Sequence, residues 1–145
     1  MSGGPRLVLA IPDPRVRLRL VAALGARAEL HPLASGEDPV RSCRSLRPEL
    51  LLLAVPATRP AEALATSRAI KTEPGAAPRV VLVDPERHTR HPQAALESAL
   101  ADGYLGLELD EAALWAFLDE VRQGKRPVRA GEPPKRGLLA RLRRS

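Results

Sequence analysis

Short apolar runs without alternation recur along the chain, and the segments between them carry apolar residues at helical spacing. Such runs are too short for ordinary helices and are typical of strands buried on both faces of a parallel sheet. Five strands alternating with five helices predict an α/β fold with a five-stranded parallel sheet, doubly wound in the flavodoxin-like order. The expected strands cover residues 6–11, 29–33, the leucine run at 50–53, 79–83 and 103–107, and the expected helices cover residues 16–24, 38–46, 60–72, 92–101 and 111–123.

A change in composition after residue 124 separates a predicted domain from a tail. We assign residues 5–124 to the domain, and residues 125–145, which are rich in Pro, Gly and Arg, to a linker and a short amphipathic tail. Residues 1–124 hold 15 basic and 16 acidic side chains, whereas residues 125–145 hold 8 basic and 1 acidic. The net charge of +6 therefore belongs to the tail, and the predicted domain is close to neutral.

Composition predicts a cytoplasmic protein. Cys43 is the only cysteine, so no internal disulfide can form, as is usual in a reducing compartment. The N-terminus shows no signal-peptide pattern, and no apolar stretch approaches the roughly 20 residues of a membrane span. Because aromatic residues make up only 2% of the chain, we expect a core of Leu, Val, Ile and Ala.

Five segments, taken in order along the chain, carry a family resemblance. They read ASGED at 34–38, PELLLLAV at 48–55, IKTEP at 70–74, PRVVL at 78–82 and ALADGYLGLELDEAALWAFLDEVRQG at 99–124. In this order and spacing they resemble the receiver domains of bacterial response regulators, and the resemblance extends over most of the predicted domain. It implies a receiver-like (βα)5 fold and a role in two-component signal transduction.

The resemblance also locates a phosphorylation site whose functional groups are absent from this sequence. Receivers hold Mg²⁺ with two acidic residues and the acceptor aspartate, and they stabilise the phosphoryl oxygens with a hydroxyl and a lysine. The acidic pair falls on Ile11 and Pro12, the acceptor on Ala54, the hydroxyl on Val83 and the lysine on Leu107. We therefore expect a degenerate site without phosphorylation, and we predict no catalytic residue, no metal and no cofactor.

Two aspartates leave open a second interpretation of this degenerate phosphorylation site. Asp13 and Asp84 each follow one of the altered positions by one residue, which would allow a displaced metal or phosphate site. Both also precede a proline, an arrangement that is common in turns. The turn role is the preferred interpretation.

Tyr104 and Trp115 are assigned to a face that binds partners. In the resemblance, Tyr104 occupies the position of the receiver aromatic whose rotation reports phosphorylation, and Val83 replaces its hydroxyl partner. Tyrosine and tryptophan are favoured as anchors of interfaces. Burial in the core is the alternative for Trp115.

The end of the chain combines leucines on one helical face with arginines around the rest. An isolated helix of this length is marginal in water, so a solvated tail is one interpretation. Docking to a protein or to the anionic inner membrane surface is another, and nucleic acid is the least favoured because no aromatic residue is present for stacking. The predicted tail contacts are Arg136, Leu138, Leu139, Arg141, Leu142, Arg143 and Arg144.

Together these patterns predict a phosphorylation-independent pseudo-receiver, not an enzyme, that acts as a protein–protein interaction module in bacterial signal transduction or localisation. Its expected partner is a signalling or polarity protein. One alternative is an active response regulator with a non-standard phosphoacceptor. Another is a membrane-surface or nucleic-acid adaptor that acts through the basic tail, which would place the protein at the periphery of the inner membrane.

Overall fold

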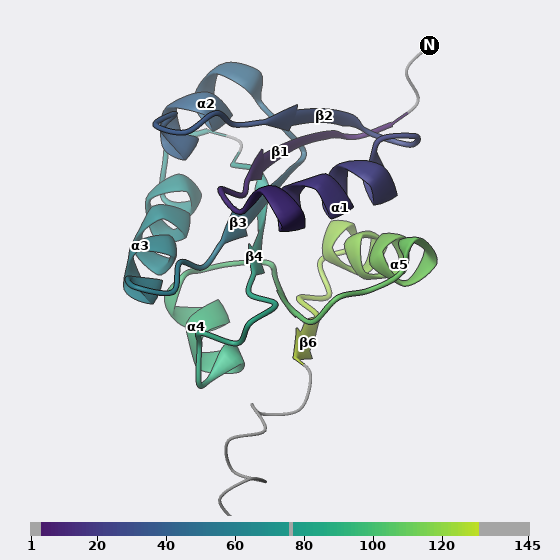
Figure 1. The fold of residues 1–145 in the computed structure, drawn as a ribbon. Helices are drawn as coiled ribbons and strands as arrows, with labels where there is room; N and C mark the ends of the chain where they lie inside the picture. The colour runs from purple at the N-terminus through teal and green to yellow at the C-terminus, as the bar shows by residue number, and fades with distance from the viewer. Residues whose placement is uncertain (1–3, 76, 131–145) are drawn as a thin grey trace, which may run out of the picture.

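The computed structural model describes residues 4–75 and 77–130, which form a parallel sheet with helices on both faces (Figure 1). The strand order is β2-β1-β3-β4-β5-β6, and every neighbouring pair is parallel. The strands are β1 (Arg6–Ala10), β2 (Glu29–Pro32), β3 (Leu50–Ala54), β4 (Arg79–Val83), β5 (Gly103–Gly106) and β6 (Val128–Ala130). The helices are α1 (Pro14–Leu24), α2 (Pro39–Leu46), α3 (Pro60–Lys71), α4 (Pro92–Ser98) and α5 (Glu111–Arg122).

The leucine run forms the central strand, as its composition predicts. Leu50, Leu51 and Leu52 are 0% exposed, and β3 pairs with β1 on one side and with β4 on the other. Successive side chains of a strand point to opposite faces, so burial of consecutive leucines requires helices above and below. The expectation of a strand that is apolar on both faces is confirmed.

Two helical layers cover the sheet. α1 and α5 pack on one face and contact each other, with Leu20, Leu24 and Phe117 in their shared core. α2, α3 and α4 cover the opposite face, where Ile70 and Leu96 belong to a second core (Figure 1). Each face of the sheet therefore has its own hydrophobic core.

Aspartates begin three of the helices. Asp13, Asp38 and Asp110 are the N-caps of α1, α2 and α5, and each side chain accepts a backbone N–H bond of 2.8–3.1 Å from the first turn. Side-chain oxygens at this position satisfy N–H groups that have no partner within the helix. Pro14 and Pro39 follow the first two caps, where a missing N–H is tolerated. Asp13-Pro14 and Asp38-Pro39 therefore mark helix starts.

Within residues 4–75 and 77–130 the sheet has six strands, so the expected count of five is wrong. β6 (Val128–Ala130) pairs in parallel with β5, and the Tyr104 N–H donates to the Pro127 carbonyl at 3.0 Å. The chain turns into β6 at Arg126, where φ is 54°, and the Arg126 guanidinium donates to the Ala101 carbonyl at 3.2 Å. The strand lies within the segment expected to be linker, because three residues among prolines and arginines give no apolar run.

Helix α4 is shorter than the helical spacing of the sequence predicts. The helix ends at Ser98 instead of residue 101. Leu100 adopts a left-handed φ of 55°, and the Ala101 N–H donates to the Leu96 carbonyl at 3.0 Å. This closing turn leads directly into β5.

Candidate functional site

The carboxyl ends of the strands meet at one edge of the sheet, where open α/β sheets bind their ligands. Ala54 at the end of β3 pairs in register with Val83 at the end of β4, and Val83 pairs with Leu105 of β5. Ile11 directly follows β1, and Leu107 directly follows β5. The fold thus brings the positions that the resemblance assigned to phosphorylation onto neighbouring strand ends.

Apolar packing occupies this part of the edge. Ile11 is 2% exposed and Val83 is 4% exposed, and both belong to the core that α1 and α5 cover, with Ala54 packed against it. Pro12 is exposed, and Leu107 is half-buried. None of these side chains offers an oxygen to a cation or a group that could accept a phosphoryl group.

A hollow of about 360 Å³ opens between the ends of β1 and β3, at the point where the strand order reverses. Its charged lining residues are Arg17, Glu37 and Glu62. The Arg17 guanidinium donates to the Ile11 carbonyl at 3.3 Å, and the Glu37 carboxylate accepts the Ala34 N–H at 2.7 Å. Sequence reasoning missed these charged residues, because they are far apart in the chain and fit no motif.

The two aspartates of the displaced-site interpretation have separate structural roles. Asp13 is exposed and caps α1, whereas Asp84 is 1% exposed and lies below the edge after β4. Across residues 4–75 and 77–130, no group of three or more His, Cys, Asp or Glu side chains could hold a metal ion. Within the described residues, no His, Cys, Asp or Glu side chain therefore joins these two carboxylates as a third metal ligand.

Asp84 is the centre of a buried hydrogen-bond network. Its carboxylate accepts the His88 N–H at 2.8 Å, the Thr89 N–H at 2.9 Å and the Tyr104 hydroxyl at 2.6 Å. Its own N–H donates to the Leu105 carbonyl at 2.8 Å. We call Asp84, His88, Thr89 and Tyr104 the Asp84 network. It fastens the loop after β4 to the side chain of a β5 residue.

The Tyr104 ring is fixed in the interior. Tyr104 is 0% exposed, and burial together with the hydrogen bond to Asp84 raises the pKa of its hydroxyl far above the usual value. The phenol therefore stays protonated and donates to the carboxylate at neutral pH. Gly106 makes room for the ring, because a Cβ there would lie 2.6 Å from Tyr104 Cε1. The spacing Tyr-x-Gly after an Asp-Pro pair is the only sequence trace of this arrangement.

Tyr104 and Trp115, which the sequence assigns to a partner face, are both buried in the structure. Trp115 is 4% exposed and belongs to the core between α1 and α5, which agrees with the alternative stated for it. The Arg27 guanidinium lies 4.6 Å from the centre of the Trp115 ring, within the range of a cation–π contact. Both aromatic rings therefore stabilise the interior.

The segment that carries the strongest resemblance has a structural role. The Asp102 carboxylate accepts the Val80 N–H at 2.8 Å and the Lys71 ammonium at 2.7 Å, in an ion pair that is mostly buried. At Gly103, an added Cβ would lie 2.9 Å from Val121 Cγ2. These contacts hold α3, β4 and α5 against β5. Asp102 and Gly103 of this segment therefore determine how these elements pack.

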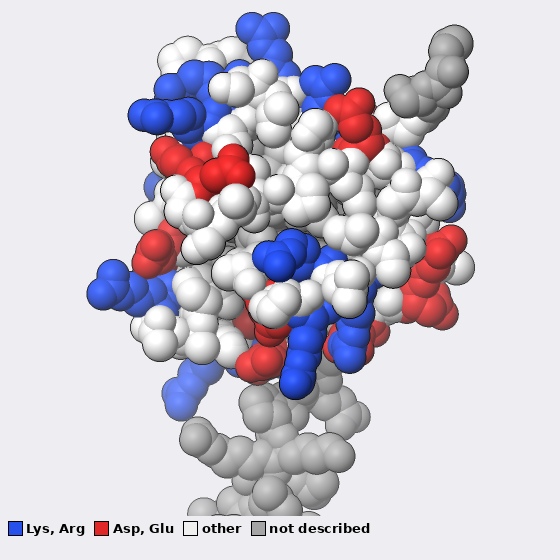
Figure 2. Space-filling model, turned by 45° about the horizontal axis from the view of Figure 1, so that its top comes forward, with Lys and Arg blue, Asp and Glu red and all other residues white. Residues whose placement is uncertain are grey.

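One face of the described residues carries charges of both signs. Figure 2 shows basic and acidic side chains mixed over one face of the molecule. No helix within residues 4–75 and 77–130 is long and apolar enough to cross a membrane. The predicted tail contacts lie outside the described residues: Arg136, Leu138, Leu139, Arg141, Leu142, Arg143 and Arg144.

Comparison with solved structures gives the fold a family name. A two-component response regulator of the LuxR family from Aurantimonas sp. SI85-9A1 matches with a TM-score of 0.66 and 21% identity, over 98% of this chain and 99% of that one. The receiver domain of the sensor histidine kinase PA1611 from Pseudomonas aeruginosa PAO1, solved with a coordinated magnesium ion, matches with a TM-score of 0.65 and 20% identity. That match covers 83% of this chain and 98% of the other.

A third solved structure agrees with these two. The signal receiver domain of a response regulator from Bermanella marisrubri has a TM-score of 0.64 and 17% identity, and the match covers 81% of this chain and 98% of that one. No model of a protein family matches the sequence, and no curated protein matches it. The fold is therefore that of response-regulator receiver domains, as the sequence motifs predicted.

Proposed function

We propose that this protein is a phosphorylation-independent pseudo-receiver that binds a protein partner in bacterial signal transduction. In this proposal it acts in the cytoplasm as an interaction module and catalyses no reaction. The observation that carries the proposal is the apolar edge of the sheet. At the strand ends, Ile11, Ala54 and Val83 pack together where the resemblance requires oxygen ligands and a phosphoryl acceptor.

The Asp84 network, which lies where β4 and β5 end, supports the same proposal. In receivers, the resemblance implies an aromatic side chain that moves when a neighbouring hydroxyl binds the phosphoryl group. Here the hydroxyl position is Val83, and Tyr104 is held inside by Asp84 at 2.6 Å. A buried, hydrogen-bonded ring favours one conformation, which suits a module whose partner surface does not depend on phosphate.

Phosphodonor treatment tests the proposal directly. The purified protein is incubated with acetyl phosphate and Mg²⁺, and separately with beryllofluoride and Mg²⁺, and its mass and its Trp115 fluorescence are recorded. We expect no added phosphoryl group and no change in emission, although Trp115 is buried beside Arg27 and would report a rearrangement of α1 against α5. Stoichiometric phosphorylation of any aspartate would instead favour the active regulator with a non-standard acceptor.

The charge distribution supports a second candidate, in which the basic tail binds an anionic membrane or nucleic acid. Residues 125–145 carry a net charge of +7, against −1 for residues 1–124. Binding of the full chain to anionic vesicles and to DNA is measured at low and at physiological salt. Replacing Leu138 and Leu142 with Gln keeps the charge, so it should weaken vesicle binding and leave DNA binding unchanged. Absence of both kinds of binding eliminates this candidate.

A further inference from the structure

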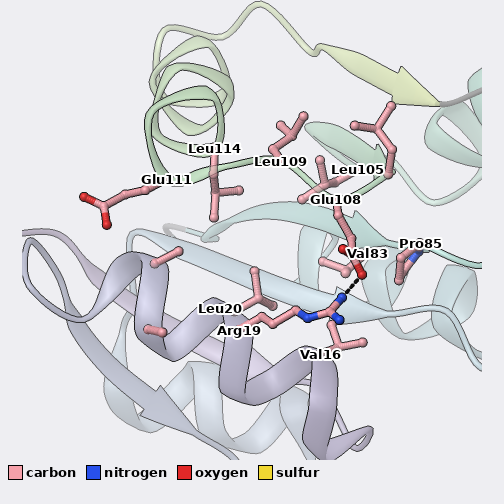
Figure 3. Close-up of a pocket in the computed structure, with 13 residues that line it drawn as sticks. Val16, Arg19, Leu20, Val83, Pro85, Leu105, Glu108, Leu109, Glu111 and Leu114 are labelled. Carbon is pink, nitrogen blue, oxygen red and sulfur yellow. Dashed lines mark ion pairs between the residues drawn. The ribbon is translucent and has the colours of Figure 1, made fainter.

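An apolar groove of about 380 Å³ runs between α1 and the start of α5 (Figure 3). Leu20 on α1 and Leu114 on α5 point into it from opposite sides, and Leu105 of β5 and Leu109 before α5 also line it. Ala22, which is exposed, continues the apolar lining along α1. A groove with aliphatic walls on two neighbouring helices fits a short amphipathic helix laid along it.

Acidic residues border this groove. Glu108 and Glu111 are exposed and belong to its lining, and Arg19 forms an ion pair with Glu108 across the opening (Figure 3). Counted together, these three side chains carry a net charge of −1. The rim therefore favours an occupant that brings leucines for the walls and arginines for the carboxylates.

The chain carries such a segment after its last described strand. Residues 137–144 contain three leucines at helical spacing and three arginines, with no acidic residue. The last described residue, Ala130, pairs with Gly106, and the residue after Gly106 is Leu107, which lines the groove. Six residues, 131–136, separate Ala130 from the segment, and they can extend over about 20 Å at about 3.3–3.6 Å per residue.

This reach is sufficient for docking within one molecule. The groove lies above the ends of β4 and β5, so β6 is separated from it by one or two strand spacings of about 4.8 Å and by the height of one helical layer, about 10 Å. A tethered segment has an effective concentration in the millimolar range, so even weak apolar contacts can keep it bound. A separate copy of the chain would lack this advantage at micromolar concentration.

We infer that the α1–α5 groove binds this chain's own C-terminal segment, residues 137–144. Leu138, Leu139 and Leu142 occupy the apolar groove, and the arginines pair with Glu108 and Glu111. The docked segment covers the groove, so an external helix, or a surface that binds the tail, competes with it. The groove is thus an interaction surface whose access depends on the tail.

Paramagnetic relaxation in the full-length protein tests this docking. A spin label is attached to the Ser145→Cys variant, and Cys43 does not compete for the label because it is buried and burial raises the pKa of its thiol to about 11. We expect strong broadening of the amide signals of Ala22, Ala23 and Leu109, and none for α3 on the opposite face. Absence of broadening at the groove overturns the inference.

A mixed sample distinguishes the chain's own tail from that of a second copy. Isotope-labelled protein without the spin label is combined with unlabelled protein that carries it. Docking within one molecule predicts no broadening in this mixture at micromolar concentration. Broadening of the groove signals there, at the strength seen in the single-chain sample, would assign the groove to the tail of a second copy and overturn docking within the chain.

Two matched substitutions localise the contact. Ala22→Arg places a bulky cation in the groove and should abolish the broadening, whereas Ala65→Arg, on an exposed position of α3, should leave it unchanged. Both replace an exposed helical alanine with arginine, so their effects on helix stability are similar. Replacing Leu138 and Leu142 with Gln alters only the tail, and this double substitution should also abolish the broadening. Broadening that persists in both the Ala22 and the leucine variants contradicts the inference.

Discussion

The strands end with their carboxyl ends at one edge of the sheet, and different interactions stabilise the two halves of this edge. Where β1 and β3 end, Ile11 and Ala54 meet through apolar contacts. Where β4 and β5 end, the buried Asp84 carboxylate accepts three hydrogen bonds and holds Tyr104 inside the fold. The β1–β3 half has lost the carboxylates that the receiver resemblance implies, and the β4–β5 half contains a carboxylate that the resemblance does not require.

This contrast shows that a carboxylate near a ligand-binding edge need not be a ligand. Apolar packing is non-directional, and substitutions of similar volume are tolerated, so the β1–β3 half should accept changes at modest cost. A buried carboxylate with several donors is directional, and removing it leaves each donor without a partner. The two halves should therefore respond very differently to single substitutions.

The largest expected effect comes from removing the Asp84 carboxylate. Asp84→Ala should lower the free energy of unfolding by about 3–4 kcal/mol, because three donors lose their acceptor and each buried unsatisfied group costs about 1–3 kcal/mol. Urea denaturation monitored by Trp115 fluorescence measures the change.

The other aspartate of the edge provides the matched control. Asp13→Ala removes an exposed helix cap and should cost about 1 kcal/mol. Tyr104→Phe removes one hydrogen bond of the Asp84 network and should cost about 1–2 kcal/mol. Equal losses for the two aspartate variants would show that the two halves of the edge do not differ as the contacts indicate.

A smaller effect is expected at Gly106, which gives the Tyr104 ring its space. Gly106→Ala should destabilise the protein by about 1–3 kcal/mol, as overpacking of a core does, because the new Cβ would lie 2.6 Å from Tyr104 Cε1. Thermal unfolding of a double-mutant cycle with Tyr104→Val measures the coupling. Most of the cost should vanish in the Tyr104→Val background, and an unchanged cost would mean that the ring is not the obstacle.

The sequence predicted more of the fold than of the candidate site. Apolar runs such as Leu50–Ala54 are local signals, so they located the central strands. Of the two Asp-Pro pairs interpreted as turns, Asp13-Pro14 begins α1, whereas Asp84-Pro85 begins the loop after β4. β6 has no such signal, because Val128–Ala130 is stabilised by pairing with β5 and not by its own composition. A truncation after Gly124, at the predicted end of the domain, would remove this strand.

Contacts between distant residues explain the rest of what the sequence could not predict. Asp84 and Tyr104 are 20 positions apart, and only the pairing of β4 with β5 places their side chains together. The prediction for Tyr104 rested on its position in the resemblance and on the preference of tyrosine for interfaces, whereas in the structure the ring is buried in space that Gly106 leaves open. A resemblance identifies positions at which a functional residue has been replaced, such as Ala54. It does not predict a buried hydrogen-bond network such as the Asp84 network.

The Asp84 network should also make stability depend on alkaline pH. Burial raises the pKa of Tyr104 in the folded protein, so its contribution is fully present below the ordinary tyrosine pKa of about 10 and is lost as the pH rises through the folded value. Relative to Tyr104→Phe, the wild-type protein should lose up to about 1.4 kcal/mol per pH unit above about pH 10. Tyr104 is the only tyrosine, so tyrosinate absorbance measures its ionisation directly. Ionisation near pH 10 without unfolding would contradict a buried hydroxyl.

The smallest expected effect concerns Mg²⁺ at the β1–β3 half. Sites with several carboxylates are destabilised by mutual repulsion, which a bound cation relieves, but Ile11 and Ala54 leave no such repulsion here. Thermal unfolding should therefore be the same in millimolar Mg²⁺ and in chelator. Ala54→Asp should lower stability by about 1 kcal/mol through partial burial of a charge, and it should restore neither Mg²⁺ sensitivity nor phosphorylation, because the other ligands are still missing. A stabilisation of several degrees by Mg²⁺ in the wild-type protein would instead indicate a displaced site, and its loss in Asp13→Asn or Asp84→Asn would identify the carboxylate that binds the cation.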